Sequence, residues 1–327
     1  MEGHDAVTRC AVDHASDPYR SRLDVVIVNW NAGPYLLGCV RSLAGAAQTA
    51  FEFGHVVVVD NASTDRSLDG IDDEPLPLRL LRNDTNRGFA AACNQGAKAG
   101  DGELLLFLNP DTRVFPETLD RAVAFMVDPA NAAIGICGAR MIGQDGSDTF
   151  CCWRFPTLRL WAAKMTGLAD AFPRWIPRQR LTAEDVGGNG IVDQVIGAFF
   201  LIRRPLFDTL NGFDERFFVY MEDVDLAYRA RHLGHASYLL ADTDVQHVEG
   251  VSSDQVRGKR LYYLLRGRTD YARKHWPPWQ AAVLVALTLT VELPVRFLLA
   301  AGRRRGQEVG DVGEAAWQYL RYVAARS

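Results

Sequence analysis

The stretch LLLFLNPD, residues 104–111, constrains the fold more than any other part of the chain. Its five apolar residues run without a break and end at Asn109-Pro110-Asp111. A short apolar run of this kind is typical of a strand buried on both faces of a parallel α/β sheet. Ligands of such sheets bind beyond the carboxyl ends of the strands. We therefore expect Asp111 at the edge where chemistry takes place, although Asn, Pro and Asp also form ordinary turns.

Other apolar runs alternate with segments of helical spacing. Leu36, Leu37, Val40 and Leu43 recur on one face of a helix that follows Gly33-Pro34. Strands that alternate with helices predict an α/β fold, with a mostly parallel, doubly wound sheet and helices on both faces. Further buried strands are expected at 23–28, 55–59, 78–81, 134–141 and 194–202, with a long loop region that contains short helices at 143–192.

Composition narrows the class of protein. The chain is 48% hydrophobic and 23% charged, and its net charge of -4 argues against general nucleic-acid binding. Its six cysteines form no CxxC pair, so we expect reduced thiols in a cytoplasmic protein. Residues 1–22 lack the apolar segment of a signal peptide and are expected to form a flexible extension.

Four acids fall at the ends of predicted elements: Asp60, Asp111, Glu222 and Asp223. A mostly parallel sheet brings such ends to one edge, a layout that suits a site for a metal and a diphosphate with a separate base. Neither GxGxxG nor GxxxxGK[ST] occurs in the chain, so the nucleotide site expected here is of another kind.

Five motifs follow one another in the chain: VVIVNWN, VVVVDNASTDRS, NRGFAAACNQG, LLLFLNPDT and GFDERFFVYMEDVDL. Because it contains these five motifs in this order, the chain resembles the family-2 inverting glycosyltransferases of GT-A fold. Within that family it resembles the rhamnosyltransferase-like branch. The resemblance covers about residues 23–255. It implies a nucleotide-sugar half at 23–141 and an acceptor and base half at 142–255, followed by a basic and amphipathic helical region at 256–327.

The resemblance also implies roles for single residues. Asp60 matches the acid that hydrogen-bonds the nucleotide base, and Asn29 and Asn31 close the first strand, where the nucleotide is held. The segment that contains Arg87 and Gly88 flanks the nucleotide. The implied nucleotide-binding positions are Asn29, Asn31, Asp60, Arg87, Gly88, Asn94, Asn109 and Asp111.

The implied metal site departs from the family pattern. Asn109-Pro110-Asp111 stands where the family has its DxD motif, and only the last acid is present. The resemblance implies that Asp111 binds Mg²⁺ or Mn²⁺, but Asn109 offers at most a neutral carbonyl, so weaker cation binding is expected. His247 falls where related enzymes have a third metal ligand, although a solvent-facing loop histidine fits its position equally well.

Glu222-Asp223 matches the ED motif of the family. In inverting transfer the acceptor hydroxyl attacks the anomeric carbon directly and loses a proton, so a carboxylate must lie within hydrogen-bond reach. The resemblance assigns Asp223 as this base, while Glu222 orients it or touches the acceptor. Both acids could instead only cap the following helix. Asp225 fits the helix and its surroundings better than catalysis.

The C-terminal region combines bases with an apolar segment. Residues 257–274 contain seven Lys or Arg and one acid, and the apolar segment 281–301 contains Glu292 and Arg296. These charges argue against a membrane-spanning helix, and the segment fits an interfacial one, or a helix pair packed on the domain. We expect a peripheral enzyme on the inner face of the cell membrane. A chain ending near residue 250 is expected to keep donor hydrolysis.

The sequence thus predicts a glycosyltransferase that moves a sugar from a nucleotide-diphosphate donor to a hydroxyl group. The resemblance favours dTDP-rhamnose as donor, and a glycan or polyprenyl-diphosphate-linked acceptor in cell-surface polysaccharide synthesis. The alternative is a non-catalytic nucleotide-sugar or glycan-binding relative, suggested by Asn109 in place of an acid. A nucleotidyltransferase would need a Gly-rich basic N-terminal loop, which the sequence lacks.

Overall fold

A mixed sheet forms the centre of the structure, a computed structural model that describes residues 20–248, 257–303 and 306–326. The strands of this sheet lie in the order β3-β2-β1-β4-β11-β6-β12-β5, and β9 pairs with β12. Their bounds are β1 (Ser21–Asn29), β2 (Phe51–Asp60), β3 (Leu78–Arg82), β4 (Leu104–Leu108), β5 (Thr112–Val114), β6 (Ile134–Ile142), β9 (Gly190–Val192), β11 (Phe199–Arg203) and β12 (Ala236–His247).

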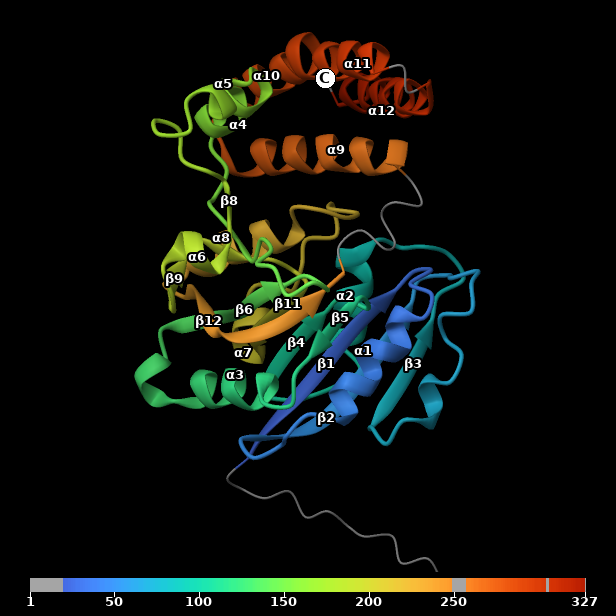
Figure 1. Cartoon of the computed structure of the whole chain (residues 1–327), viewed down its shortest axis with the longest axis vertical. Coiled ribbons are helices and arrows are strands. Elements are labelled where there is room, and N and C mark those ends of the chain that lie inside the picture. Colours follow the sequence, from blue (N-terminus) through green and yellow to red (C-terminus); the bar gives the residue numbers. More distant parts are fainter. Residues whose placement is uncertain (1–19, 249–256, 304–305, 327) are drawn as a thin grey trace, which may run out of the picture.

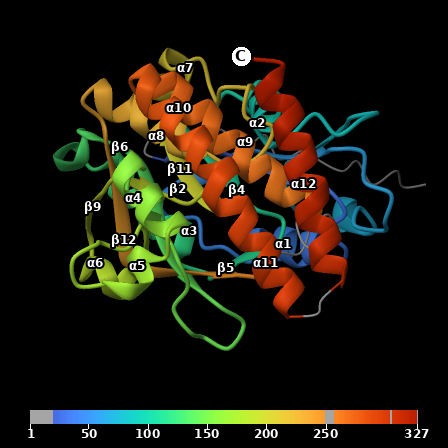
Figure 2. The same cartoon turned by 90° about the horizontal axis from the view of Figure 1, so that it is seen from above.

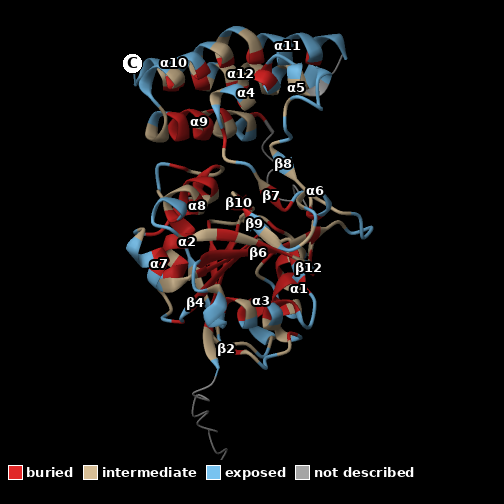
Figure 3. Cartoon of the chain, turned by 90° about the vertical axis from the view of Figure 1, so that its left-hand side faces the viewer, coloured by how far each residue is buried: buried red, intermediate tan, exposed pale blue. Residues whose placement is uncertain are grey.

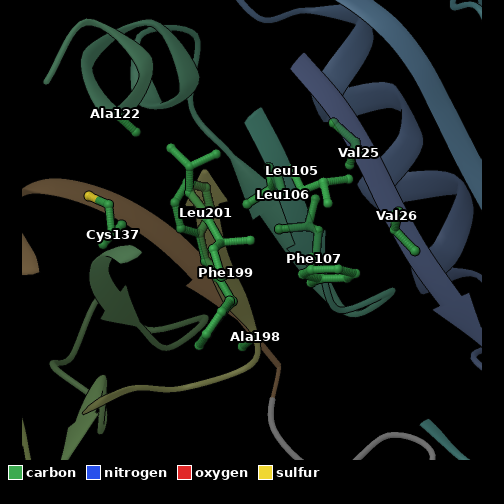
Figure 4. Close-up of a cluster of buried hydrophobic side chains, with 14 of the residues drawn as sticks. Val25, Val26, Leu105, Leu106, Phe107, Ala122, Cys137, Ala198, Phe199 and Leu201 are labelled. Atoms are coloured by element: carbon green, nitrogen blue, oxygen red, sulfur yellow. The ribbon is translucent and has the colours of Figure 1, made fainter. Parts of the chain in front are cut away.

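The expected parallel α/β arrangement is present where the sequence predicts it. β1 pairs in parallel with β2 and β4, β2 with β3, and β6 with β12, while β11, β5 and β9 run antiparallel to their neighbours. Every residue of β4 is buried, because β1 and β11 flank it and helices cover the sheet. Figure 4 shows Leu105, Leu106 and Phe107 of β4 packed between these two strands.

Helices cover both faces of the sheet. α1 and α3 lie on one face, and α2 and α7 on the other (Figures 2 and 3). α1 buries Leu36, Cys39, Val40 and Leu43, which is the apolar face expected from the sequence. The α-helices within residues 20–248 are α1 (Tyr35–Ala44), α2 (Phe89–Ala97), α3 (Thr118–Val127), α4 (Leu158–Met165), α5 (Leu168–Ala171), α6 (Ala183–Val186), α7 (Arg204–Thr209) and α8 (Glu222–His232).

Several predicted boundaries differ from the structure, and two of the differences bear on the fold. β1 begins at Ser21, before the expected end of the extension near Arg22, and residues 1–19 lie outside the described part of the chain. The run 194–202 is not one strand: Gln194–Val195 (β10) joins a small sheet with β7 (Cys152–Trp153) and β8 (Arg180–Leu181), and only β11 enters the main sheet. The chain turns between them because the Gly197 N–H bonds to a side chain instead of a neighbouring strand.

The C-terminal helices form a layer above the carboxyl edge of the sheet (Figure 1). A shared apolar cluster joins them to the α/β domain: Phe217, Met221 and Val224 pack with Tyr271 and Leu284. The helices are α9 (Arg257–His275), α10 (Pro278–Leu287), α11 (Leu293–Gly302) and α12 (Gly306–Ala324), with a π-helical turn at Thr288–Glu292. The region therefore packs on the domain, as one of the two readings of the sequence expects.

The outermost helix of this layer is apolar on its exposed side. Within the described residues, one continuous helix, Pro278–Gly302, is long and apolar enough to cross a membrane, and 22% of its most apolar stretch is buried. Phe297 and Leu298 are among its exposed residues, at 45% and 69% of their full surface. The helix therefore combines packing on the domain with an apolar surface turned away from it.

Candidate active site

A cavity of about 1150 Å³ opens at the carboxyl edge of the sheet, below the C-terminal helices. Three regions that the sequence singles out converge on it: the end of β4, the start of α8 and the end of β12. The predicted site residues that line it are Gly88, Asn109, Asp111, Glu222, Asp223 and His247.

Asp111 and His247 lie side by side in this cavity. β12 pairs antiparallel with β5, which places His247 opposite Thr112 and its Nε2 3.4 Å from Oδ1 of Asp111. Both side chains are 10% exposed, and the buried Nδ1 of His247 has no hydrogen-bond partner among the described residues. A carboxylate oxygen and an imidazole nitrogen thus converge from two strands. The carboxylate suits Mg²⁺ or Mn²⁺, and the imidazole suits a transition-metal ion rather than Mg²⁺.

Asn109 forms the turn that presents Asp111. Its N–H donates to Ala198 of the neighbouring strand at 3.0 Å, and its carbonyl accepts a bond from the Thr112 hydroxyl at 2.7 Å. The stretch after β4 is therefore a turn, as its composition predicts. The same turn directs Asp111 to the cavity, so the structural and the functional interpretation are compatible.

A second group of metal-ligand side chains lies at the opposite edge of the sheet. Single ligand atoms of Asp24, His55 and Asp101 come within 4.8 Å of one another. Arg204 already neutralises Asp24 at 2.6 Å, and the Gly102 N–H donates to the same carboxylate at 2.7 Å. These contacts stabilise the buried carboxylate of Asp24 in β1. None of the three metal-ligand side chains lines the cavity.

Asp223 is held in a fixed orientation by three hydrogen bonds. Its Oδ2 accepts bonds from the Gly197 N–H at 3.0 Å and from Nε2 of Gln194 at 2.9 Å, and its Oδ1 accepts the Val224 N–H at 2.8 Å. Burial raises the pKa of this carboxyl, and these bonds partly oppose that effect because they stabilise the anion. An ordered carboxylate with a raised pKa is suited to accept a proton near neutral pH.

Glu222 beside it is in a different environment. Its side chain is 5% exposed, and its Oε2 has no hydrogen-bond partner among the described residues. Burial, followed by the charge of Asp223, raises the pKa of Glu222 well above its usual range. The raised pKa of Glu222 favours its protonated form, while the three hydrogen bonds to Asp223 favour the charged form of that carboxyl.

The backbone before this pair is strained. Tyr220 and Met221 have φ values of +69° and +78°, a region that side chains other than glycine rarely adopt. α9 packs directly against this turn, since a Cβ on Gly267 would lie 2.8 Å from the Tyr220 carbonyl oxygen. The close contact supports the turn that brings Glu222 and Asp223 to the cavity.

The predicted nucleotide residues at the ends of β1 and β2 bond to one another. The buried amide of Asn29 donates to Asp60 at 2.9 Å, to Ser63 at 3.0 Å and to Ser67 at 2.8 Å. The side-chain oxygen of Asn31 accepts the Thr64 N–H at 2.7 Å. These residues order the 61–67 loop and do not line the cavity themselves.

Of the three predicted nucleotide residues around α2, Gly88 lines the cavity, whereas Arg87 and Asn94 do not. Gly88 has a φ of +88°, and a Cβ there would lie 2.5 Å from the Phe218 carbonyl oxygen, so only glycine fits beside this cavity wall. Asn94 is buried and exchanges hydrogen bonds with the backbone of Phe213 at 2.9 Å. Arg87 is exposed and directs its guanidinium toward Gln95.

Sequence reasoning misses several residues of the site. Asn61 lines the cavity, and its side chain bonds to Asn86 and to the Gly88 carbonyl, both at 3.1 Å. Its place directly after Asp60 in VVVVDNASTDRS is a signal that could have identified it. Gln194 is a buried side chain with no such signal, because only the fold brings it to Asp223.

Asp225 lies behind the cavity, as expected. It is fully buried and forms ion pairs with Arg229 at 2.7 Å, Lys274 at 2.6 Å and His275 at 2.7 Å. Burial alone would raise the pKa of Asp225, but the bond from His275 and the charges of Arg229 and Lys274 lower it to about 2. This network ties α8 to α9.

Residues 24–210 match the family model described as glycosyl transferase family 2. The chain belongs to this family. It is 28% identical over 310 residues to the N-acetylglucosaminyl-diphospho-decaprenol L-rhamnosyltransferase of Mycobacterium tuberculosis, and the alignment covers 86% of this chain and 96% of that protein. It is also 27% identical over 132 residues to rhamnosyltransferase WbbL of Escherichia coli, covering 40% of this chain and 47% of that one.

A solved structure of the same fold is that of mannosyltransferase PcManGT from Pyrobaculum calidifontis in complex with GDP-Man and Mn²⁺. The TM-score is 0.54 at 19% identity, over 93% of this chain and 88% of that one. The family, the GT-A fold and the glycosyltransferase class predicted from the sequence are thereby confirmed.

Proposed function

We propose that this family-2 glycosyltransferase is an inverting enzyme that transfers L-rhamnose to a hydroxyl of an N-acetylglucosaminyl-diphospho-polyprenol in cell-surface polysaccharide synthesis. One observation carries the mechanism: the Asp111–His247 pair and the Glu222–Asp223 pair line the same cavity. The similarity to the mycobacterial rhamnosyltransferase, which extends over 96% of that protein, supports the choice of donor sugar and acceptor.

In the proposed reaction Asp223 accepts the proton of the acceptor hydroxyl. The hydroxyl oxygen forms the new bond to the anomeric carbon as the bond to the diphosphate oxygen breaks, and the nucleoside diphosphate leaves with the electron pair. Because Gly197, Gln194 and Val224 hold the Asp223 carboxylate, little reorganisation is needed during proton transfer. The raised pKa of Glu222 favours its neutral form, and in that form the pair does not carry two adjacent charges.

Asp111 and His247 fit a divalent cation by the chemistry of their donor atoms. Mg²⁺ sites in proteins often use one or two carboxylates together with substrate phosphates, so a single acid is sufficient. A bound Mg²⁺ or Mn²⁺ supplies Lewis-acid neutralisation of the leaving diphosphate. Asp60, Asn29 and Asn31, with the 61–67 loop that they order, form the proposed nucleotide half of the site.

The proposed location is the inner face of the cell membrane. A polyprenyl-linked acceptor lies in the membrane, while nucleotide sugars are water-soluble. The exposed apolar side of Pro278–Gly302 supports this location, because burial of apolar side chains at the interface holds a protein at a membrane surface.

A donor screen tests the proposal. The purified protein is incubated with Mn²⁺ or Mg²⁺ and a panel of nucleotide sugars, and nucleoside diphosphate release is measured. Release that is highest with dTDP-rhamnose is the expected result. Release only from other nucleotide sugars contradicts the proposed donor, and release of inorganic diphosphate contradicts glycosyl transfer itself.

A further inference from the structure

The cavity continues outward from the carboxylates to the C-terminal helices, where its walls are strongly charged. Six charged residues of α9, α11, the turn after α11, and α12 line this outer part: Lys259, Arg260, Arg296, Arg303, Glu308 and Asp311. Four are bases and two are acids, so this part carries a net positive charge although the whole chain has a net charge of -4. The outer cavity is therefore suited to an anionic group.

Two of the bases are available to a ligand. Lys259 and Arg303 are exposed, and neither forms an ion pair within the part of the chain that the structure describes. Arg296 is positioned by Glu292 at 2.9 Å, and Glu292 is itself buried against Arg268 at 2.5 Å. This chain of ion pairs holds the Arg296 guanidinium at the cavity while its side chain stays 42% exposed.

An apolar surface on α11 lies next to these bases. Leu299 lines the cavity and is also 53% exposed, so it connects the interior with the outer surface of α11. Phe297 and Leu298 lie next to it on the same helix and are exposed. α10 and α11 are the elements farthest from the sheet in Figure 1. From the inside outward, the molecule thus presents carboxylates, then bases, then an apolar face.

We propose that the outer cavity is a binding subsite for the diphosphate of a polyprenyl-diphosphate-linked acceptor. Lys259, Arg296 and Arg303 bind the phosphate oxygens, and the isoprenoid chain passes over Leu299 to the apolar side of α11. The inference rests on the proposed function, since it places the acceptor hydroxyl at Asp223. The order of chemical groups along such an acceptor, sugar, diphosphate and hydrocarbon, is the order of the surfaces that it meets.

The size of the cavity and the chemistry of its walls support this subsite. Single-ligand pockets usually measure about 300 to 1,000 Å³, so a cavity of about 1150 Å³ has room for part of a second substrate. Arginine binds phosphate through two parallel hydrogen bonds, which gives geometric specificity as well as affinity. Anionic headgroups of membrane lipids would be attracted by the same bases, and the experiment separates the two ligands.

The test compares two acceptors and two double variants in detergent solution. The acceptors are N-acetylglucosaminyl-diphospho-farnesol and a farnesyl N-acetylglucosaminide that lacks both phosphates. Lys259→Ala/Arg303→Ala removes two charges from the subsite. The matched control, Lys98→Ala/Arg321→Ala, removes one Lys and one Arg that are exposed and do not line the cavity.

We expect Lys259→Ala/Arg303→Ala to raise the KM for the diphosphate acceptor by about tenfold or more, because two charge-assisted contacts are lost. The KM for the phosphate-free acceptor and for the donor should change less than about twofold. The control double variant should behave as the wild type with both acceptors. Arg296→Lys should raise the KM for the diphosphate acceptor as well, because lysine cannot bind phosphate in bidentate fashion.

Three outcomes overturn the inference. An equal rise in KM for both acceptors would mean that the bases do not recognise phosphate. Unchanged acceptor KM, with weaker binding of Lys259→Ala/Arg303→Ala but not of the control to anionic vesicles, would mean that the bases bind lipid headgroups. If the wild type releases nucleoside diphosphate but transfers sugar to neither acceptor, the proposed acceptor class is wrong, and this result is distinguishable from a defect confined to the variants.

Discussion

Gln194 helps to orient the Asp223 carboxylate and to stabilise its charged form. Its amide donates to Oδ2 of Asp223 at 2.9 Å, and the same oxygen accepts the Gly197 N–H. Both bonds lower the pKa of Asp223 against the larger effect of burial, which raises it. Gln194 thus acts through the base, as a positioning residue.

We predict that Gln194→Met moves the acid limb of the pH profile of kcat to higher pH. The reaction needs the Asp223 anion, so activity falls as the pH drops through its pKa, and losing a bond to the anion raises that pKa further. A decrease in kcat of about tenfold at neutral pH is also expected. The measurement is kcat at a series of pH values from about 5 to about 9, which covers an acid limb near neutral pH. Gln48→Met, at an exposed position outside the cavity, is the matched control, and an unshifted limb in Gln194→Met contradicts the role.

The metal assignment can be tested at both edges of the sheet. Asp111→Asn should weaken Mn²⁺ binding and donor binding together, because Asp111 would hold the cation that neutralises the donor diphosphate. Asp101→Asn alters the other group of metal-ligand side chains and should change neither. Isothermal titration with Mn²⁺, with and without nucleoside diphosphate, measures both constants. If Asp101→Asn abolishes Mn²⁺ binding and Asp111→Asn does not, the metal lies at the wrong edge for the proposed mechanism.

At the scale of elements, the contact between α8 and α9 is held by a buried carboxylate. Asp225 on α8 bonds to Lys274 and His275 on α9 and to Arg229 on its own helix. Its pKa is lowered to about 2 in the folded chain from an ordinary value of 3.8. A lowered folded-state pKa stabilises the fold above the unfolded-state pKa, and this contribution is lost as the pH falls through the folded-state value.

We therefore predict that Asp225→Asn lowers the free energy of unfolding at pH 7 by about 2 to 3 kcal/mol, as the pKa difference implies. The difference from the wild type should shrink as the pH falls from about 4 toward 2. Urea unfolding at pH 7 and pH 3 measures it, with the exposed Asp84→Asn as control. A difference that is the same at both pH values would show that the charge of Asp225 contributes nothing.

Particular residues show which elements the sequence could predict. β4 follows from a local pattern, and the resemblance to the family assigns roles to Asp111 after β4, Asp223 in α8 and His247 at the end of β12. The break at 196–198 could not be predicted, because apolar residues run through it and only the bond from Gly197 to Asp223 ends the strand pairing. The basic run at 257–274 suggests a membrane-surface region from the sequence. Only tertiary packing shows that Lys259 and Arg260 of this run, with Arg296 and Arg303, line the cavity.

For the molecule as a whole, the C-terminal helices are part of the active-site architecture. Phe217, Met221 and Val224 flank the Glu222–Asp223 pair in the sequence and pack against Tyr271 and Leu284. The expectation that a chain ending near residue 250 keeps donor hydrolysis therefore changes. Such a chain loses the packing partners of the turn that positions both acids.

We now predict that the shortened chain loses both vesicle binding and donor hydrolysis. Phe297→Ser/Leu298→Ser should separate the two properties, because these residues are exposed on the apolar side and do not line the cavity. This variant should sediment less with anionic vesicles and keep donor hydrolysis. Cosedimentation across a salt series and nucleoside diphosphate release are the measurements. Full donor hydrolysis by the shortened chain would show that α9 only packs on the domain.

The central claim is direct displacement at the anomeric carbon with Asp223 as base, and product analysis tests it most directly. The wild type is incubated with dTDP-rhamnose, metal and N-acetylglucosaminyl-diphospho-farnesol, and the anomeric configuration of the product is determined by NMR. We predict one nucleoside diphosphate per glycoside, a configuration opposite to that of the donor, and a rate at least about 10²-fold lower in Asp223→Asn with donor affinity retained. A product with the configuration of the donor, or wild-type turnover in Asp223→Asn, would contradict the account.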